Sequence, residues 1–238
     1  MASALICTAA VSTNWVAFGL DMAPSTAASQ IAFDIFVAGG ASSSVSSKTV
    51  AMTVGALANY LLVGVVGDAT SDLVTGVTYN GVAMTQLAKA YNANWVYVYG
   101  LYAPATGVSH NIVASASGSC STLGLDAVSY TNLSVIQPNT SVSILLSSSK
   151  TAWTSFAPIT TGCLGVQLAF NTSGAAITGI VATGTGVTPL TRVADAGVLS
   201  ISDTNGPVPF ANAVVLTPNT AQWAVQRIAL KVRREESQ

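Results

Sequence analysis

Short apolar segments alternate with Gly, Ser and Thr along most of this chain. The segments are rich in Val, Ile, Leu, Tyr and Thr, and turn-forming residues recur about every eight to twelve residues, which is typical of a β-sandwich or barrel. No long stretch follows the helical period. We therefore predict an all-β protein with strands at residues 48–54, 60–66, 74–79, 82–88, 95–102, 111–116, 123–130, 165–170, 177–182, 189–193, 213–216 and 224–232.

The clearest local signal is the dipeptide Asn80-Gly81, which lies between two β-forming segments. A two-residue type I′ turn needs a positive φ at both of its central residues, and Asn followed by Gly meets this need at the lowest steric cost. The sequence therefore predicts a tight hairpin that joins Tyr79 to Val82.

A second pattern is the alternation of aromatic and aliphatic residues in one predicted strand. Trp95, Tyr97 and Tyr99 should point to one face of the strand, and Val96 and Val98 to the other. Such an aromatic face either packs at a core edge or protein interface, or stacks against sugar rings. The usual place of these residues on half-buried sheets favours packing. The three aromatic residues are nevertheless the candidate binding residues of the chain.

The low charge content is the most informative feature of the composition. Only 7% of the 238 residues are Asp, Glu, Lys or Arg, against about 25% in an average soluble domain. The formal net charge of −1 argues against nucleic acid and anionic membranes as partners. Apolar runs such as residues 60–66 are much shorter than the ~20 residues of a spanning helix. The surface suits either repeated contact with copies and partners or a hydroxyl-rich extracellular domain.

We divide the chain into three parts. Residues 1–41 form an expected N-terminal arm, joined through the Gly/Ser-rich stretch at 39–44, which is typical of a flexible linker. Residues 42–232 form the β-sandwich, and residues 233–238 form a charged tail. The arm is rich in apolar side chains, so it should pack on its own domain or on a neighbouring subunit. The competing interpretation is an ordinary first pair of strands.

Candidates for catalysis are few. The single histidine, His110, is not accompanied by a Gly-x-Ser-x-Gly motif, so we interpret it as a loop or strand-edge residue. No Glu precedes residue 235, and a pair of catalytic carboxylates would have to come from Asp residues. The Asp residues before the tail are Asp21, Asp34, Asp68, Asp72, Asp126, Asp195 and Asp203.

Metal binding and thiol chemistry have weak signals. Asp68 and Asp72 share one loop and could either hold Ca²⁺ or form a turn. The spacing of Cys7, Cys120 and Cys163 does not fit a zinc site, so these thiols are expected to pack in the core, although pairing between subunits stays open. No metal or other cofactor is predicted. The N-terminus makes a poor secretory signal, so we expect folding in a reducing cytoplasm.

Five sequence blocks carry a family resemblance over residues 48–232. They are YLLVGV at 60–65, VTGVTYNG at 74–81, LYAPATG at 101–107, DAVSY at 126–130 and QWAV at 222–225. In this order they resemble a jelly-roll-like β-sandwich family found in bacteriophage virion proteins and some bacterial surface proteins. The resemblance implies an antiparallel, jelly-roll-like sandwich with a structural or adhesive role and no enzymatic activity. It does not cover residues 1–41.

The leading hypothesis is a non-enzymatic phage virion structural protein, a capsid decoration or cement subunit that assembles in the host cytoplasm. Its expected partners are the major capsid protein or other virion proteins and copies of itself, for example in a trimer. The pattern does not distinguish a head from a tail location. The alternative is a carbohydrate- or receptor-binding module of a tail fibre or bacterial surface protein that uses Trp95, Tyr97 and Tyr99. A third hypothesis is an Asp-based glycosidase.

Overall fold

The computed structural model confirms an all-β protein. It describes residues 31–92, 94–133, 143–147, 152–153, 163–171, 179–183, 190–193, 199–203, 213–217 and 223–231. In these ranges the chain forms strands and turns without a helix, so none of the described segments is a helix that could span a membrane. All strand pairs that the structure describes are antiparallel.

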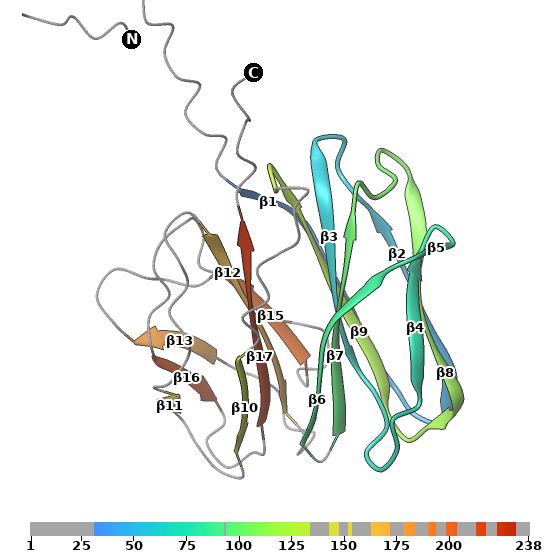
Figure 1. Ribbon diagram of the computed structural model, residues 1–238, viewed down its shortest axis with the longest axis vertical. Helices are drawn as coiled ribbons and strands as arrows, with labels where there is room; N and C mark the ends of the chain where they lie inside the picture. The colour runs from blue at the N-terminus through green and yellow to red at the C-terminus, as the bar shows by residue number, and fades with distance from the viewer. Residues whose placement is uncertain are drawn as a thin grey trace, which may run out of the picture.

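The N-terminal half forms two facing sheets, which confirms the predicted β-sandwich (Figure 1). We call them the central sheet and the outer sheet. The central sheet has the order β1-β9-β3-β7-β6, and the outer sheet has the order β2-β8-β4-β5. The strands are β1 (Ala32–Ser42), β2 (Val45–Thr53), β3 (Ala58–Val66), β4 (Val74–Tyr79), β5 (Val82–Ala83), β6 (Thr85–Asn92), β7 (Asn94–Tyr102), β8 (Ser109–Cys120) and β9 (Leu123–Thr131).

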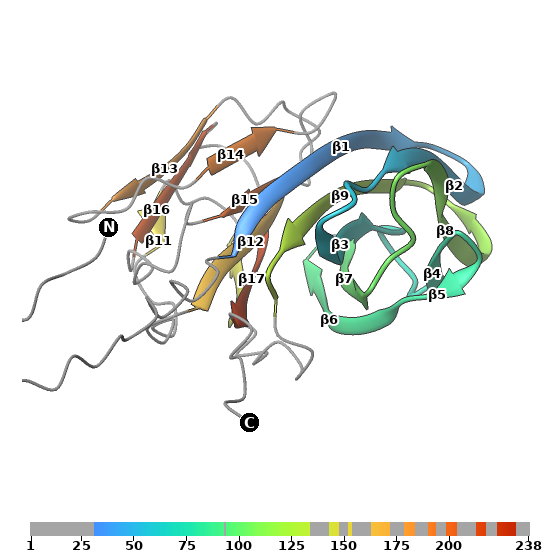
Figure 2. The same ribbon diagram turned by 90° about the horizontal axis from the view of Figure 1, so that it is seen from above.

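The C-terminal half forms two further sheets, with the orders β10-β17-β12-β15-β14 and β11-β16-β13. Figure 2 shows the first of these beside the central sheet, on the side away from the outer sheet. The strands are β10 (Ser143–Ser147), β11 (Ala152–Trp153), β12 (Cys163–Asn171), β13 (Gly179–Thr183), β14 (Leu190–Val193), β15 (Leu199–Asp203), β16 (Ala213–Thr217) and β17 (Trp223–Lys231).

The inner strands of the central sheet, β9, β3 and β7, are therefore buried on both faces. In β3 every residue except Asn59 is buried, and in β9 every residue except Thr131 is buried. Leu61 and Val63 pack toward the outer sheet, whereas Leu62 belongs to a second cluster that includes Val166 of β12. Two-sided burial explains why the strands read as continuous apolar runs rather than as an apolar and polar alternation. Each such Val or Leu contributes about 1.5–3 kcal/mol by leaving water.

The predicted hairpin at Asn80-Gly81 is confirmed. Asn80 has a φ of 49° and Gly81 a φ of 76°, as a type I′ turn requires. The flanking residues pair in register, with Tyr79 opposite Val82. The hairpin ends the outer sheet, and the chain then crosses into the central sheet as β6.

The expected boundary at Ala41 is corrected, because β1 runs from Ala32 to Ser42 and pairs with β9. The Gly39-Gly40 pair is no flexible linker; the register shifts between Ala38 and Ala41, which marks a β-bulge. A Cβ on Gly39 would collide with backbone and side-chain atoms of the core. The Gly39 amide donates instead to the buried Asp126 carboxylate at 3.1 Å. Residues 1–30 and the tail at 233–238 lie outside the described residues.

Replacing Gly81 by Val should lower the free energy of unfolding by about 1 kcal/mol or more, because a β-branched residue resists positive φ. No atom lies within 4 Å of the position that a Cβ would take, so backbone strain alone is tested. Gly76→Ala is the matched control, because that site is equally open and has no positive φ. Urea unfolding measures both variants, and equal midpoints for the two would contradict the turn assignment.

Removing residues 1–41 should destabilise the sandwich more than removing residues 1–30. The longer deletion takes away β1 and with it Asp34, which accepts hydrogen bonds from the Gly55 amide at 2.9 Å and the Ser129 hydroxyl at 2.6 Å. It also removes the Gly39 donor of Asp126. Buried polar groups that lose partners cost about 1–3 kcal/mol each. Circular dichroism and urea unfolding test this, and equal stability of the two truncated proteins would overturn it.

Candidate functional site

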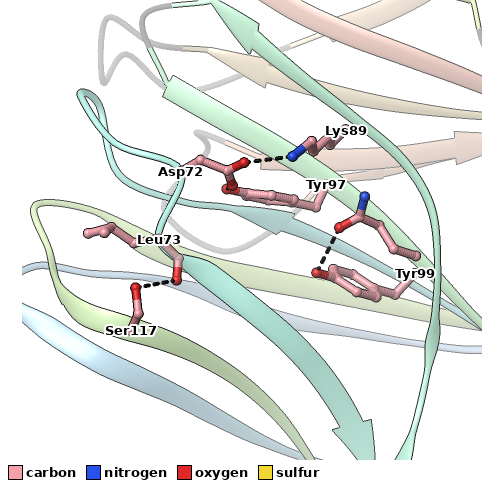
Figure 3. A network of polar contacts seen from close by, with 7 residues as sticks. Asp72, Leu73, Lys89, Tyr97, Tyr99 and Ser117 are labelled. Atoms are coloured by element: carbon pink, nitrogen blue, oxygen red, sulfur yellow. Dashed lines mark hydrogen bonds and ion pairs between the residues drawn. The ribbon is translucent and has the colours of Figure 1, made fainter.

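A group of polar and aromatic side chains lies at one edge of the sandwich, and Figure 3 shows its members Asp72, Lys89, Tyr97 and Tyr99. We call it the seam cluster. It draws residues from the loop before β4 and from β6 and β7, so a loop and a hairpin together position it. Its members are Asp72, Gln86, Lys89, Tyr91, Trp95, Tyr97 and Tyr99.

Tyr97 and Tyr99 connect the core to this edge. Their exposed fractions are 0% and 3%, and each hydroxyl reaches the rim, Tyr97 donating to Asp72 at 2.6 Å and Tyr99 to Gln86 at 3.3 Å. Burial, followed by the bond to Asp72, raises the pKa of Tyr97, and burial also raises the pKa of Tyr99. Both residues therefore carry a neutral hydroxyl at neutral pH.

The predicted alternation of β7 is confirmed, and burial limits which of its rings a ligand could reach. Trp95, Tyr97 and Tyr99 follow one another on one face, with 6.4 Å between successive ring centroids. Val96 and Val98 lie in the cluster on the other face. Since the outer sheet covers Tyr97 and Tyr99, a ligand cannot stack on their rings. A strand that lies between two apolar layers buries its large aromatic rings in preference to smaller side chains. Only Trp95, at the end of the row, is half-buried.

Asp72 and Lys89 form an ion pair at the mouth of the seam. The Lys89 ammonium lies 2.6 Å from the Asp72 carboxylate, and both side chains are partly exposed. The hydrogen bond from Lys89, and then that from Tyr97, lowers the pKa of the Asp72 carboxyl. A carboxylate that is stabilised in its charged form is a weak base. This group is therefore suited to accepting hydrogen bonds rather than protons.

Tyr91 extends the aromatic row onto β6. It lies opposite Trp95 across the tight β6–β7 turn, with ring centroids 5.3 Å apart and planes inclined at 46°. The Lys89 ammonium lies 5.4 Å from the centroid of the Trp95 ring, within the range of a cation–π contact. The Tyr91 hydroxyl donates to the carbonyl of Ala69 at 3.0 Å, and 46% of the residue is exposed.

The loop that holds Asp72 is fixed by Asp68, which is 5% exposed. One oxygen of Asp68 accepts from the amide of Thr70 at 2.7 Å, its hydroxyl at 2.8 Å and the amide of Ser71 at 3.1 Å. The other accepts from the amide of Ser121 at 2.7 Å. These bonds, above all that from Ser121, lower the pKa of Asp68.

Of the two interpretations of this loop, the geometry favours the turn over calcium binding. Protein donors occupy the Asp68 oxygens, and Asp72 faces Lys89. Within the described ranges, no three His, Cys, Asp or Glu side chains gather where they could hold a metal ion.

The remaining candidates lie away from the seam cluster. His110 lies in β8, half-buried, with its ring edge-to-face to Tyr79 at 5.6 Å between centroids. It borders a shallow hollow at the other end of the sandwich with Asn80, Gly81 and Asn111, among others. Cys120 is fully buried, and burial raises the pKa of its thiol, so it packs in the core as expected.

The other Asp residues either make structural contacts or lie where the structure describes no side chain. Asp34 and Asp126 accept backbone amides within the central sheet, as described above. Only the backbone of Asp203 in β15 and of Cys163 in β12 is described. The remaining candidates, Asp21, Asp195 and Cys7, lie outside the described residues.

Replacing Asp68 by Ala should lower the free energy of unfolding at pH 7 by about 2 kcal/mol, because several amide and hydroxyl donors lose a charged acceptor. Asp72→Asn is the control, since an exposed ion pair contributes less than about 1 kcal/mol. The folded-state pKa of Asp68 is below its ordinary value of 3.8, so its contribution is complete above that pH and declines below it. Urea unfolding between pH 7 and 3 should show a flatter acid limb for Asp68→Ala, and an unchanged acid limb would contradict this role.

The seam cluster combines a charged acceptor on a loop with a charged donor and two partly exposed aromatic rings on β6 and β7. This combination is suited to binding, and the nearest carboxylate is a weak base. Comparison of the chain with protein-family models, curated proteins and solved structures gave no match to any of them.

Proposed function

We propose that this chain is a non-enzymatic structural subunit of a bacteriophage virion, a capsid decoration or cement protein. The observation that carries the proposal is the surface of the outer sheet that faces away from the core. The sequence resemblance to virion β-sandwich proteins supports the same role. The proposal includes the jelly-roll-like connectivity of the strands that membership of this family would imply.

The exposed surface of the outer sheet is broad and uncharged. Its strands pair in register, so that residues alternating with the buried ones form rows across β2, β8 and β4. Thr49, for example, lies opposite Val113, which lies opposite Thr78. The residues of this surface, which we call the neutral face, are Ser47, Thr49, Ala51, Thr53, Thr78, Ala83, Ser109, Asn111, Val113 and Ser115.

A neutral face suits repeated packing for an energetic reason. Burying a charge at an interface costs several kcal/mol unless a partner compensates it, and hydroxyl groups can exchange water for a partner at much lower cost. Copies of the same neutral face also do not repel one another. Since a capsid presents many identical sites, a subunit with 7% charged residues and such a face fits this role.

Partners follow from this proposal. The neutral face, or residues 1–30, would contact the major capsid protein or another virion protein, and self-association as a trimer is the expected assembly. The chain would assemble in the host cytoplasm and remain in the virion.

The test is binding of the purified protein to heads of the encoding phage that were assembled without it. Sedimentation and electron microscopy should show stoichiometric, regular occupancy. The double variant Thr49→Lys, Asn111→Lys introduces two charges on the neutral face and should weaken binding by about tenfold or more. Leu57→Lys is the control, because Leu57 is 85% exposed in the turn before β3 and lies outside the neutral face.

Two outcomes would overturn parts of this proposal. If the protein does not bind heads, a capsid role is excluded and a tail or cell-surface role takes its place. If the double variant and the Leu57→Lys control bind equally, the neutral face is not the attachment surface and residues 1–30 become the next segment to test.

A further inference from the structure

Large exposed apolar side chains occur mostly alone on this sandwich, but Tyr91 does not. Leu57 and Val108, the most exposed of them, lie in turns. Tyr91 instead adjoins Trp95, and an ion pair lies beside the two rings. A partly exposed aromatic pair beside polar groups can contact a small ligand, because the rings supply apolar area and the polar groups fix its orientation.

The polar groups retain hydrogen-bonding capacity toward solvent. The Lys89 ammonium carries three N–H donors, of which the ion pair with Asp72 accounts for one. The Asp72 oxygens accept from Lys89 and Tyr97, and each carboxylate oxygen can accept a second bond. A ligand on the adjacent rings would therefore find one donor and one acceptor group 2.6 Å apart.

The site is also rigid before a ligand arrives. Asp68 fastens the loop to Ser121 in the β8–β9 turn, and the Tyr91 hydroxyl holds the same loop through Ala69. Tyr97 fixes Asp72 from below, as Figure 3 shows. Groups that are already ordered lose little conformational entropy on binding, which favours even a small ligand.

These features select one class of ligand. A pyranose presents a flat C–H face that packs on aromatic rings and hydroxyl pairs that both donate and accept hydrogen bonds, which matches the rings and the adjacent ion pair. Nucleic acid fits poorly, because Asp72 offsets the only charge that Lys89 offers. We propose that Tyr91, Trp95, Lys89 and Asp72 form a binding site for a neutral saccharide. The site does not depend on a role in the virion.

The test begins with an immobilised array of bacterial surface polysaccharides and neutral mono- and disaccharides, probed with the full-length protein. Saturation-transfer NMR with the methyl glycosides of glucose, galactose, mannose and N-acetylglucosamine then identifies which sugar protons contact the protein. We expect binding of at least one saccharide, with the strongest transfer to ring C–H protons.

Variants then locate the site. Tyr91→Ala should weaken binding by at least about tenfold, and Lys89→Met should weaken it by a smaller factor. Tyr91→Phe keeps the ring and should retain most of the affinity. Leu57→Ala is the control, because it removes an even more exposed apolar side chain elsewhere. Unfolding midpoints measured in parallel show whether each variant is folded.

Three results would overturn the proposal. One is no binding in either assay by the wild-type protein. Another is binding that Tyr91→Ala and Lys89→Met leave unchanged. The third is self-association of the wild-type protein that Tyr91→Ala abolishes, because the rings would then form a contact between copies. None of these results bears on capsid attachment, which the variants of the neutral face test separately.

Discussion

The constraint on which this structure depends is the burial of the inner strands of the central sheet, β9, β3 and β7, on both faces. A strand without a solvent face has no place for an uncompensated polar side chain, because burying such a group costs free energy unless a hydrogen bond satisfies it. Asp126 and Ser129 in β9 are fully buried. Their partners come from β1: the Gly39 amide for the carboxylate, and the Asp34 carboxylate for the hydroxyl. The edge strand β1 therefore supplies hydrogen-bond partners to buried polar groups of the core, in addition to its backbone pairing with β9.

The same constraint produces the seam cluster. Tyr97 and Tyr99 fill the interior with large rings, but their hydroxyl groups need partners, and these are available only where the two sheets separate at the edge. The partners, Asp72 and Gln86, lie on elements that are partly exposed to solvent. The need of two buried tyrosine hydroxyls for partners thus brings a carboxylate, a lysine and two rings together at the surface, where they can contact a ligand.

Sequence reasoning succeeded where a pattern has one local cause. Asn80-Gly81 predicted a turn because backbone sterics decide its geometry, and the faces of β7 followed from a period of two. It failed at Gly39-Gly40, because glycine pairs are common in linkers and the need for a bulge arises from Leu125 and Asp126, far along the chain. Strands β10, β11 and β15 were not predicted, since short or Ser-rich segments become strands through their neighbours, and β1 was foreseen only by the competing interpretation of residues 1–41.

The site was only partly accessible to the same reasoning. The sequence singled out Trp95, but the contribution of Tyr91 depends on the register of the β6–β7 turn, and that of Lys89 and Asp72 on how a loop lies against the sheet. The tyrosines of the seam have one more consequence. Because burial raises the pKa values of Tyr97 and Tyr99, their hydroxyls favour folding up to the pH at which free tyrosine ionises, and this contribution is lost as the pH rises through their own higher values. An ionised phenol would have to leave the core, so these two rings, together with the other buried tyrosines, make the sandwich less stable in alkaline surroundings.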